Sequence, residues 1–442
     1  MNIGIMHFPP GRRPGTLKAM EEAVAHLSSE NNLGRVDQGP INFRWKHGAG
    51  GGKAAWRWQR QLFGFRDGSG KRLCGLVNGT SIAGVLPSAQ FSNTLTYSVL
   101  QLWNAHDPPV RPFALHATWM RQQREEYKRM RMREEGLWRD KPSWYGRPAR
   151  NALSAEAAST VEGFVVYTPA LRREWLRVVP MAEKGGIPVP HLVLMHEQMR
   201  QMRNALFIAR ALGRALVLPY TRCTCEMGFF PYHVHEGCRA PDHPTLPLPY
   251  NCSIDHYLDP VALDTSPFAH RERTFLTNPR TPRSVLASTV RVAVDGAAAS
   301  ADAASAAAAA AAADSGGVIR LPRAPTIATL RERLGAASAK VLVFDDVLAS
   351  FGGWGDAPSA SERAELATFH EDAQKLFSSW CCTADERFKR LAGVIPYVLP
   401  PLEGQAHWRG HKHLAWAASA LADVFAAANE TRRAAQIRPP SV

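Results

Sequence analysis

Residue types suited to holding a phosphorylated ligand gather in one stretch, "FALHATWMRQQREEYKRMRMREEGLW", from Phe113 to Trp138. A short apolar run there ends in His116, and a strongly basic segment follows that includes Lys128 and Arg129. Manganese accepts an imidazole ligand well, and basic side chains stabilise the charge that develops on a leaving diphosphate. The stretch is therefore compatible with a metal-bound diphosphate, held by His116 and contacted by Lys128 or Arg129.

A plainer interpretation of the same stretch stays open. His116 can be an ordinary strand-end residue, and the basic segment can be a helix on which Glu125 and Arg129 pair at i,i+4 spacing. Most of the positive charge then forms a solvated face, and Lys128 or Arg129 is the exception that contacts a phosphate.

Two further polar pairs carry less weight as catalytic candidates. Asp255 and His256 in "NCSIDHYL" are adjacent, and neighbours on a strand point to opposite faces of the sheet. A structural role is therefore expected for them rather than a catalytic dyad. Asp345 and Asp346 follow the apolar run in "KVLVFDDV" and are expected to form a loop pair at the end of a strand.

The elements that position these side chains belong to a globular chain. It has 442 residues, 45% of them hydrophobic, and a formal net charge of +14. This length suits two or three domains with their own cores, and the apolar share argues against wholesale disorder. The positive charge favours anionic partners without choosing among nucleic acid, acidic lipid and phosphorylated small molecules. No apolar stretch of the sequence is long enough to cross a bilayer as a helix.

Four of the seven cysteines lie close together in the sequence, at Cys223, Cys225, Cys238 and Cys252. Histidines are interleaved with them, so a zinc site is conceivable. The spacing is not the paired C-x-x-C pattern of ordinary zinc modules. We therefore favour disulfides, which form in an oxidising compartment.

One local unit is clear from periodicity. In "MHEQMRQMRNALFIARALGRALVLP", five apolar residues share one helical face, Gly213 is expected to end the helix, and "RALVLP" is expected to be a buried strand. The five are Met195, Met199, Met202, Leu206 and Ala209. Helix, turn and strand form an α/β unit of a parallel sheet, and "KVLVFDDV" predicts another strand.

The alanine-rich stretch at about 293–317 is interpreted as an inserted linker, and "ASERAELATFHEDAQKLFSSW" as a helix.

Several stretches, taken together and in order, resemble glycosyltransferase family 77, the nucleotide-diphospho-sugar transferases that include the plant and algal extensin arabinosyltransferases. In the first half they are "NIGIMHFPP", "RVDQGPINF", "IAGVLPSAQFSNTLTY" and "FALHATWMR" leading to "REEGLWRDKPSWY". In the second half they are the helix–strand unit above, "NCSIDHYL", "RERTFLTNPRTP" and "SSWCC". The ordered set covers most of the chain.

The resemblance implies an α/β protein: a partial GT-A domain at 1–150 and a second α/β domain at 161–442 that ends in helices. It implies retaining transfer of a sugar from a UDP-sugar donor, assisted by a divalent metal, Mn²⁺ or Mg²⁺. The sugar would be a pentose such as arabinofuranose or xylose, or galactose. The acceptor would be a cell-wall glycoprotein or polysaccharide, and the full-length enzyme a single-pass type II membrane protein of the Golgi lumen.

The resemblance also assigns roles to individual residues. His116 stands where the family's metal-binding histidine is expected, and Asn2 and Gly4 lie in the strand that faces the donor. Asp37 and Gln38 are expected beside the transferred sugar. Asp37 could be the nucleophile of a double displacement, or could steer charge in a front-face attack. From the residues alone it could equally be a helix cap.

The chain departs from the family in one respect, because it contains no Asp-x-Asp sequence. In the family this acidic turn precedes the "NIGI" strand, so we expect it, together with the membrane anchor, before Met1. The chain by itself is then expected to be inactive. Two alternatives follow: a non-catalytic remnant of the fold, and a basic protein that binds polyanions or nucleic acid. The absence of zinc-finger or RNP motifs argues against a nucleic-acid partner.

Overall fold

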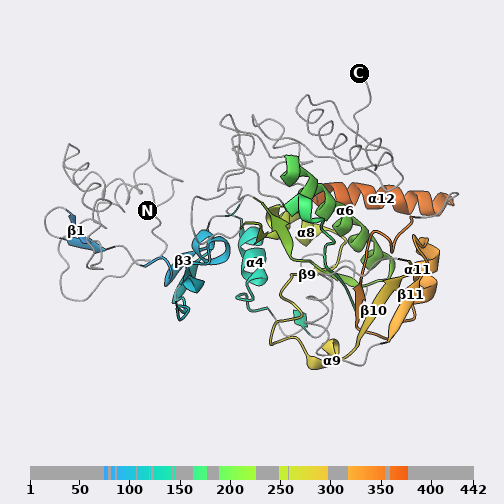
Figure 1. The fold of residues 1–442 in the computed structure, drawn as a ribbon, viewed down its shortest axis with the longest axis horizontal. Coiled ribbons are helices and arrows are strands. Elements are labelled where there is room, and N and C mark those ends of the chain that lie inside the picture. Colours follow the sequence, from blue (N-terminus) through green and yellow to red (C-terminus); the bar gives the residue numbers. More distant parts are fainter. Residues whose placement is uncertain are drawn as a thin grey trace, which may run out of the picture. The chain divides into compact units, whose positions relative to one another are not determined.

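The computed structural model describes residues 74–77, 81–84, 87–105, 107–118, 120, 124–140, 144–145, 163–176, 189–224, 248–256, 258–296, 317–353 and 359–376 (Figure 1). The chain divides into two compact units. The first comprises residues 1–97 and 101–116, and the second comprises residues 98–100 and 117–442. The domain boundary predicted between 150 and 161 lies outside the described residues and stays a prediction.

The described part of the first unit contains two small sheets and, between β3 and β4, a 3₁₀ turn (Leu102–Asn104). Strands β1 (Cys74–Val77) and β2 (Ser81–Gly84) form an antiparallel hairpin. Strands β3 (Phe91–Asn93) and β4 (Ala114–His116) pair in parallel, and His116 is the last residue of β4, opposite Asn93. The prediction that His116 ends a strand is confirmed. The "NIGI" strand lies outside the described residues.

The second unit is built around a six-stranded sheet in which all pairings are parallel. Its strand order is β11 (Val318–Leu321), β10 (Thr289–Val294), β12 (Val341–Phe344), β5 (Phe164–Tyr167), β6 (Ala215–Val217) and β9 (His270–Arg271). The central strands β5 and β12 are buried along their whole length, as expected for a parallel sheet covered on both faces. The α/β prediction is confirmed; the narrower GT-A assignment stays an expectation.

Helix α6 (Val189–Ala211) and strand β6 are the unit predicted from periodicity. The five apolar residues predicted to share one helix face are all buried. Gly213 follows the helix with φ +62°, a conformation that glycine adopts at no steric cost, and β6 starts two residues later. Helix α6 packs against β5, β6 and α11 (Ile327–Leu334).

A hydrophobic cluster lies on the sheet face formed by alternate residues of its central strands. Phe164 and Val166 of β5 and Val341 and Val343 of β12 contribute to it, because residues two apart on a strand share a face. The segment after β9, including the short helix α9 (Arg283–Leu286), covers this cluster together with Trp144 and Tyr145. This cluster contains no residue of α6.

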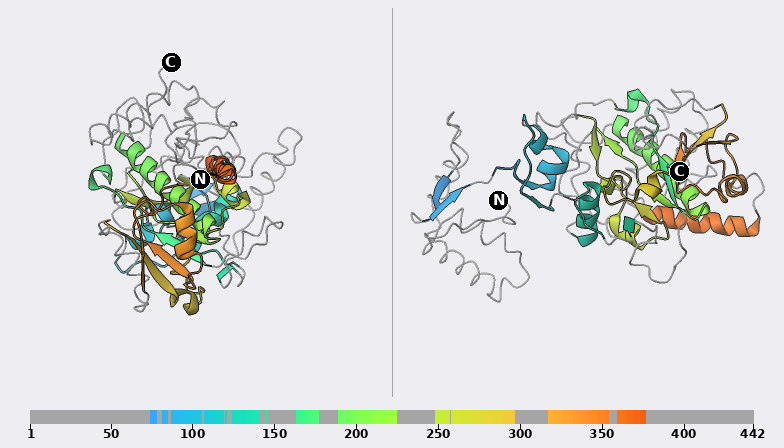
Figure 2. Two further views of the ribbon diagram at one scale, coloured as in Figure 1. Left: turned by 90° about the vertical axis from the view of Figure 1, so that its right-hand side faces the viewer. Right: turned by 90° about the horizontal axis from the view of Figure 1, so that it is seen from below.

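The remaining elements flank the sheet. Strands β7 (Thr221–Cys223) and β8 (Tyr250–Cys252) form an antiparallel pair, followed by a 3₁₀ turn (Ile254–His256) and helix α8 (Pro260–Thr265). Helix α4 (Glu125–Glu134) packs against α8. The long helix α12 (Ala360–Leu376), orange in both figures, also packs against α8 (Figure 1; Figure 2).

Several finer predictions can be compared with these elements. The strand in "KVLVFDDV" and the helix at α12 are confirmed. Strand β10 runs through Val294, so the first residues of the predicted insertion at 293–317 belong to the sheet. A disulfide joins Cys223 to Cys252 and ties β7 to β8, which agrees with the preference for disulfides over zinc; Cys225 and Cys238 lie outside the described residues. None of the helices in the described part of the chain is long and apolar enough to cross a membrane.

Candidate functional site

Helix α4 carries the basic segment singled out in the sequence. Glu125 and Glu126 lie in its first turn and Arg131 and Arg133 in its last, an order that complements the helix dipole. The predicted i,i+4 ion pair between Glu125 and Arg129 is confirmed, at 3.0 Å. However, Arg131 is buried and Arg133 nearly so. The prediction that this charge forms a solvated face is wrong for the C-terminal half of the helix.

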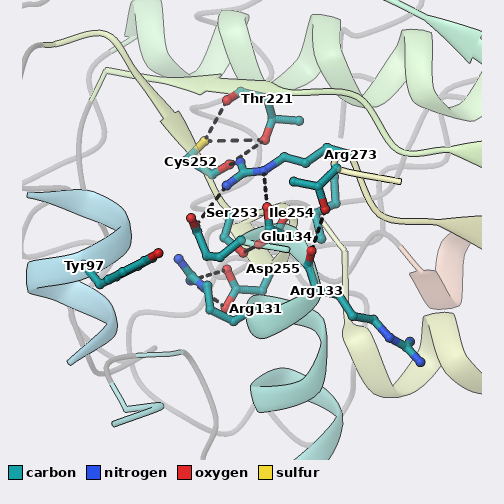
Figure 3. A network of polar contacts seen from close by, with 12 residues as sticks. Tyr97, Arg131, Arg133, Glu134, Thr221, Cys252, Ser253, Ile254, Asp255 and Arg273 are labelled. Carbon is teal, nitrogen blue, oxygen red and sulfur yellow. Dashed lines mark hydrogen bonds and ion pairs between the residues drawn. The ribbon is translucent and has the colours of Figure 1, made fainter. Parts of the chain in front are cut away.

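Arg131 is held by a carboxylate from a distant part of the chain. Its guanidinium lies 3.0 and 3.2 Å from the two oxygens of Asp255, and both side chains are almost fully buried (Figure 3). Burial raises the pKa of Asp255, but the charge of Arg131 and a hydrogen bond from His256 outweigh it and hold that pKa well below the ordinary value. The pair is therefore a fully desolvated ion pair inside the second unit.

His256 adjoins this ion pair. Its Nδ1 lies 3.3 Å from Asp255, and its Nε2 lies 3.4 Å from the hydroxyl of Tyr250. Asp255 and His256 belong to a 3₁₀ turn rather than to the expected strand. The argument that strand neighbours point to opposite faces therefore does not apply to them, and their side chains do touch. Each residue is only 1% exposed, and Asp255 is bonded to Arg131. Both observations support the predicted structural role.

The end of α4 is clamped to the segment that follows β8. Glu134 accepts hydrogen bonds from the Ile254 amide, at 2.8 Å, and from the Ser253 hydroxyl. Burial raises the pKa of Glu134, because the charged form is desolvated. Arg273 donates to the Cys252 carbonyl at 2.9 Å (Figure 3). The disulfide from Cys252 to Cys223 continues the connection to β7.

Arg133 connects α4 to the carboxyl end of β9. Two of its nitrogens donate to Asp140, at 2.5 and 3.0 Å, and a third lies 3.3 Å from Glu272. The guanidinium carbons of Arg133 and Arg271 lie 3.9 and 4.0 Å from the ring centre of Trp144, close enough for cation–π attraction. The result is a cluster of two cations, two carboxylates and one indole.

A small cleft of about 10 Å³, with space for about one water molecule, lies beside this cluster. It is lined by polar and aromatic side chains from α4, the segment after α4 and the segment after β9, among them Arg133, Trp138, Asp140, Trp144, Glu272 and Asn278. Burial raises the pKa of Glu272 to about 7, against the opposing charge of Arg133. A carboxyl group with a shifted pKa at a cleft is a functional-site candidate on physical grounds.

The residues predicted from the sequence are distributed over both units. His116 is half-buried at the end of β4 in the first unit, and Lys128 and Arg129 lie on α4 in the second. Lys128 is half-buried, whereas Arg129 pairs with Asp264 of α8 as well as with Glu125. Four predicted residues lie outside the described part of the chain, and their roles stay predictions: Asn2, Gly4, Asp37 and Gln38.

The cleft residues were missed by sequence reasoning. Glu272 and the tryptophans lie in "RERTFLTNPRTP" and "REEGLWRDKPSWY", which were used only for the resemblance. One signal could have indicated them: charged residues directly after a short strand of a parallel sheet lie at the edge where ligands bind in α/β proteins. Among the described residues, no group of three or more His, Cys, Asp or Glu side chains is placed to hold a metal ion.

The amino-acid sequence is similar to that of a plant arabinosyltransferase. The chain is 26% identical over 319 residues to arabinosyltransferase XEG113 of Arabidopsis thaliana. The match covers 69% of this chain and 43% of the relative, so the chain spans less than half of that protein. This similarity confirms the resemblance predicted from the sequence. No family model matches the chain, and no solved structure matches it.

Proposed function

We propose that the protein is a glycosyltransferase that moves a pentose, arabinofuranose in the first place, from a nucleoside-diphosphate donor to a cell-wall glycoprotein. The observation that carries this proposal is the similarity to an arabinosyltransferase over 69% of the chain. The parallel α/β sheet of the second unit is compatible with it. Xylose and galactose as transferred sugars, and a polysaccharide as acceptor, are the variants of the proposal that an assay must separate.

The reaction exchanges one bond at the anomeric carbon for another. The bond from that carbon to the diphosphate oxygen breaks, and UDP leaves with the bonding electrons. A bond to the oxygen of an acceptor hydroxyl forms, and the proton of that hydroxyl passes to the released UDP or to water. Asp37 and Gln38 are proposed to lie beside the sugar, and Asn2 and Gly4 along the donor. Lys128 is proposed to face the diphosphate, because a partly buried cation stabilises the charge that develops there. Arg129, the other proposed phosphate contact, is engaged by Glu125 and Asp264.

A divalent metal, Mn²⁺ or Mg²⁺, belongs to the proposal with His116 as one ligand. Such a metal would supply positive charge to the leaving diphosphate. The described residues do not form a metal site by themselves. Any further ligands of the metal would come from residues outside the described part of the chain.

The proposed place of action is the Golgi lumen, in a type II membrane form of the full-length protein. The disulfide between Cys223 and Cys252 supports an oxidising compartment. The polyanion-binding alternative loses support from α4, because three of its arginines are engaged by carboxylates of the second unit.

A transfer assay on the full-length protein tests the proposal. The protein is incubated with manganese, a hydroxyproline-rich acceptor peptide carrying short arabinosides, and in turn UDP-arabinofuranose, UDP-xylose and UDP-galactose. We expect a mass increase of one pentose with the first donor. His116→Ala should lower the rate about 10- to 100-fold, the usual cost of disturbing a metal ligand or its support. The exposed Arg111→Ala, just before β4, should leave it unchanged. Absence of transfer with every donor would refute the proposal and favour the non-catalytic remnant.

A further inference from the structure

Three stretches of the sequence have the Asn-x-Ser/Thr pattern at which secreted proteins carry N-linked oligosaccharides, and none of them has proline in the middle. They are Asn78-Gly79-Thr80, Asn251-Cys252-Ser253 and Asn429-Glu430-Thr431. The pattern is short and also occurs by chance, so it marks a site only where the asparagine can carry a bulky group. Of the three asparagines, Asn251 lies in the described part of the chain, on strand β8.

Strand β8 turns the Asn251 side chain outward. Its neighbours Tyr250 and Cys252 are buried, whereas Asn251 is exposed, because successive residues of a strand point to opposite faces. Arg222 lies opposite it on β7 and donates to its Oδ1 at 2.8 Å. Within the described part of the chain, the amide nitrogen of Asn251 has no hydrogen-bond partner.

This geometry suits an N-linked glycan. The sugar replaces one of the two hydrogens on the Asn251 amide nitrogen and leaves the amide oxygen as an acceptor. The folded protein can therefore carry a glycan at Asn251 while the hydrogen bond from Arg222 stays in place.

The other two residues of the pattern are inaccessible in the folded chain. Cys252 is 1% exposed and forms the disulfide with Cys223. Ser253 is 2% exposed, and its hydroxyl donates to Glu134 at the end of α4 (Figure 3). The hydroxyl residue is part of what defines the pattern, so the enzyme that attaches the glycan must reach Ser253. Attachment therefore has to precede the docking of this segment on α4.

We propose that Asn251 is an N-glycosylation site, modified before β8 pairs with β7, and that its glycan projects from the solvent face of this two-stranded sheet. The Asn251 nitrogen forms a bond to the anomeric carbon of an oligosaccharide carried on a lipid diphosphate. The bond from that carbon to the diphosphate oxygen breaks, the lipid diphosphate leaves with the bonding electrons, and the proton lost by the nitrogen passes to water. The inference rests on the proposed function only for the luminal location, which the disulfide supports.

Peptide mass spectrometry of the full-length protein, made in secretory eukaryotic cells, tests the site. Reduction and trypsin release residues 240–271, in which Asn251 is the single asparagine. Peptide N-glycosidase in heavy-oxygen water converts a glycosylated asparagine into heavy aspartate, which we expect at position 251. Asn251→Gln keeps an amide oxygen for Arg222 and should lose this label completely. Asn278→Gln, at an asparagine followed by proline, is the matched control and should leave the label on 240–271 unchanged.

A cysteine variant tests the order of events. Cys223→Ser removes the disulfide and leaves Asn251-Cys252-Ser253 unaltered, so the segment stays accessible for longer. The labelled fraction of 240–271 should be at least as large as in the unaltered protein. A smaller labelled fraction would overturn the proposal that attachment precedes pairing of β7 with β8.

The outcomes separate this inference from the proposed function. Unmodified Asn251 in a protein that is glycosylated at Asn78 or Asn429 would overturn the inference and leave the proposed location standing. A protein without any N-glycan would overturn both. A protein that carries the glycan at Asn251 but transfers no pentose would reject the arabinosyltransferase activity alone. If Asn251→Gln does not fold, the labelled peptide of the unaltered protein decides.

Discussion

The two halves of helix α4 contain the same kinds of residues and differ in what those residues do. In the N-terminal half, Glu125 is exposed, Lys128 is half-buried and Arg129 pairs with the buried Asp264. In the C-terminal half, Arg131 and Glu134 are buried and bonded to the segment after β8. Charge density along a helix therefore does not identify a ligand-binding face. The carboxylates that reach the helix from elsewhere determine which cations remain available to a ligand.

The buried half should show the largest effect on stability. Arg131→Ala leaves Asp255 buried without its cation, and the loss of one partner of a buried pair costs about 3–5 kcal/mol. Arg291→Ala is the matched control, because it breaks an Arg–Asp pair whose arginine is 49% exposed, and such pairs contribute about 0–1 kcal/mol. Urea unfolding followed by circular dichroism measures both.

A double variant sharpens this comparison. Arg131→Met combined with Asp255→Leu removes both charges and should recover most of the lost stability, since well-packed apolar side chains can replace a buried ion pair. Equal losses for Arg131→Ala and Arg291→Ala would contradict the assignment of Arg131 to a desolvated structural pair.

The second largest effect expected is on the pH dependence of stability, and it concerns Glu272, the partner of Arg133 at the cleft. Its pKa is about 7 in the folded chain against an ordinary 4.5, so between these pH values the folded state binds more protons than the unfolded state. The contribution of Glu272 to stability is therefore full below about pH 4.5 and falls as the pH rises to 7. Arg133 and Arg271 oppose this shift and Asp140 adds to it.

Glu272→Gln keeps the shape and removes the titration. Relative to the unaltered chain, the variant should gain about 2–3 kcal/mol of unfolding free energy between pH 4.5 and 7. The neighbouring His270, whose pKa burial lowers to about 3, makes both proteins less stable as the pH falls below about 6.5, and its contribution cancels in the difference. A difference that stays constant with pH would show that folding does not raise the pKa of Glu272.

The contacts of α4, compared with those of α6, show which features could be predicted from the sequence. The unit of α6, Gly213 and β6 was predictable because its contacts lie within one local pattern, and so was β12. The ion pair of Arg131 with Asp255 joins residues 124 apart, and that of Arg133 with Glu272 joins residues 139 apart. No local period encodes such contacts, because they form only when the folded sheet brings distant segments together.

The smallest effect is expected in the N-terminal half of α4, at the proposed phosphate contact Lys128. Lys128→Ala should raise the KM for the UDP-sugar a few-fold in the full-length protein, since one partly exposed cation contributes on the order of 1 kcal/mol. The difference from the unaltered protein should shrink as salt rises, because ions screen exposed charges within about 10 Å at 0.1 M. Arg129→Ala is the paired variant on the same helix. Its guanidinium is engaged by Glu125 and Asp264, so its loss should lower the unfolding free energy and leave the KM for donor unchanged. The reverse result, with donor affinity dependent on Arg129 and independent of Lys128, would mean that the ion pairs of Arg129 open to admit the diphosphate.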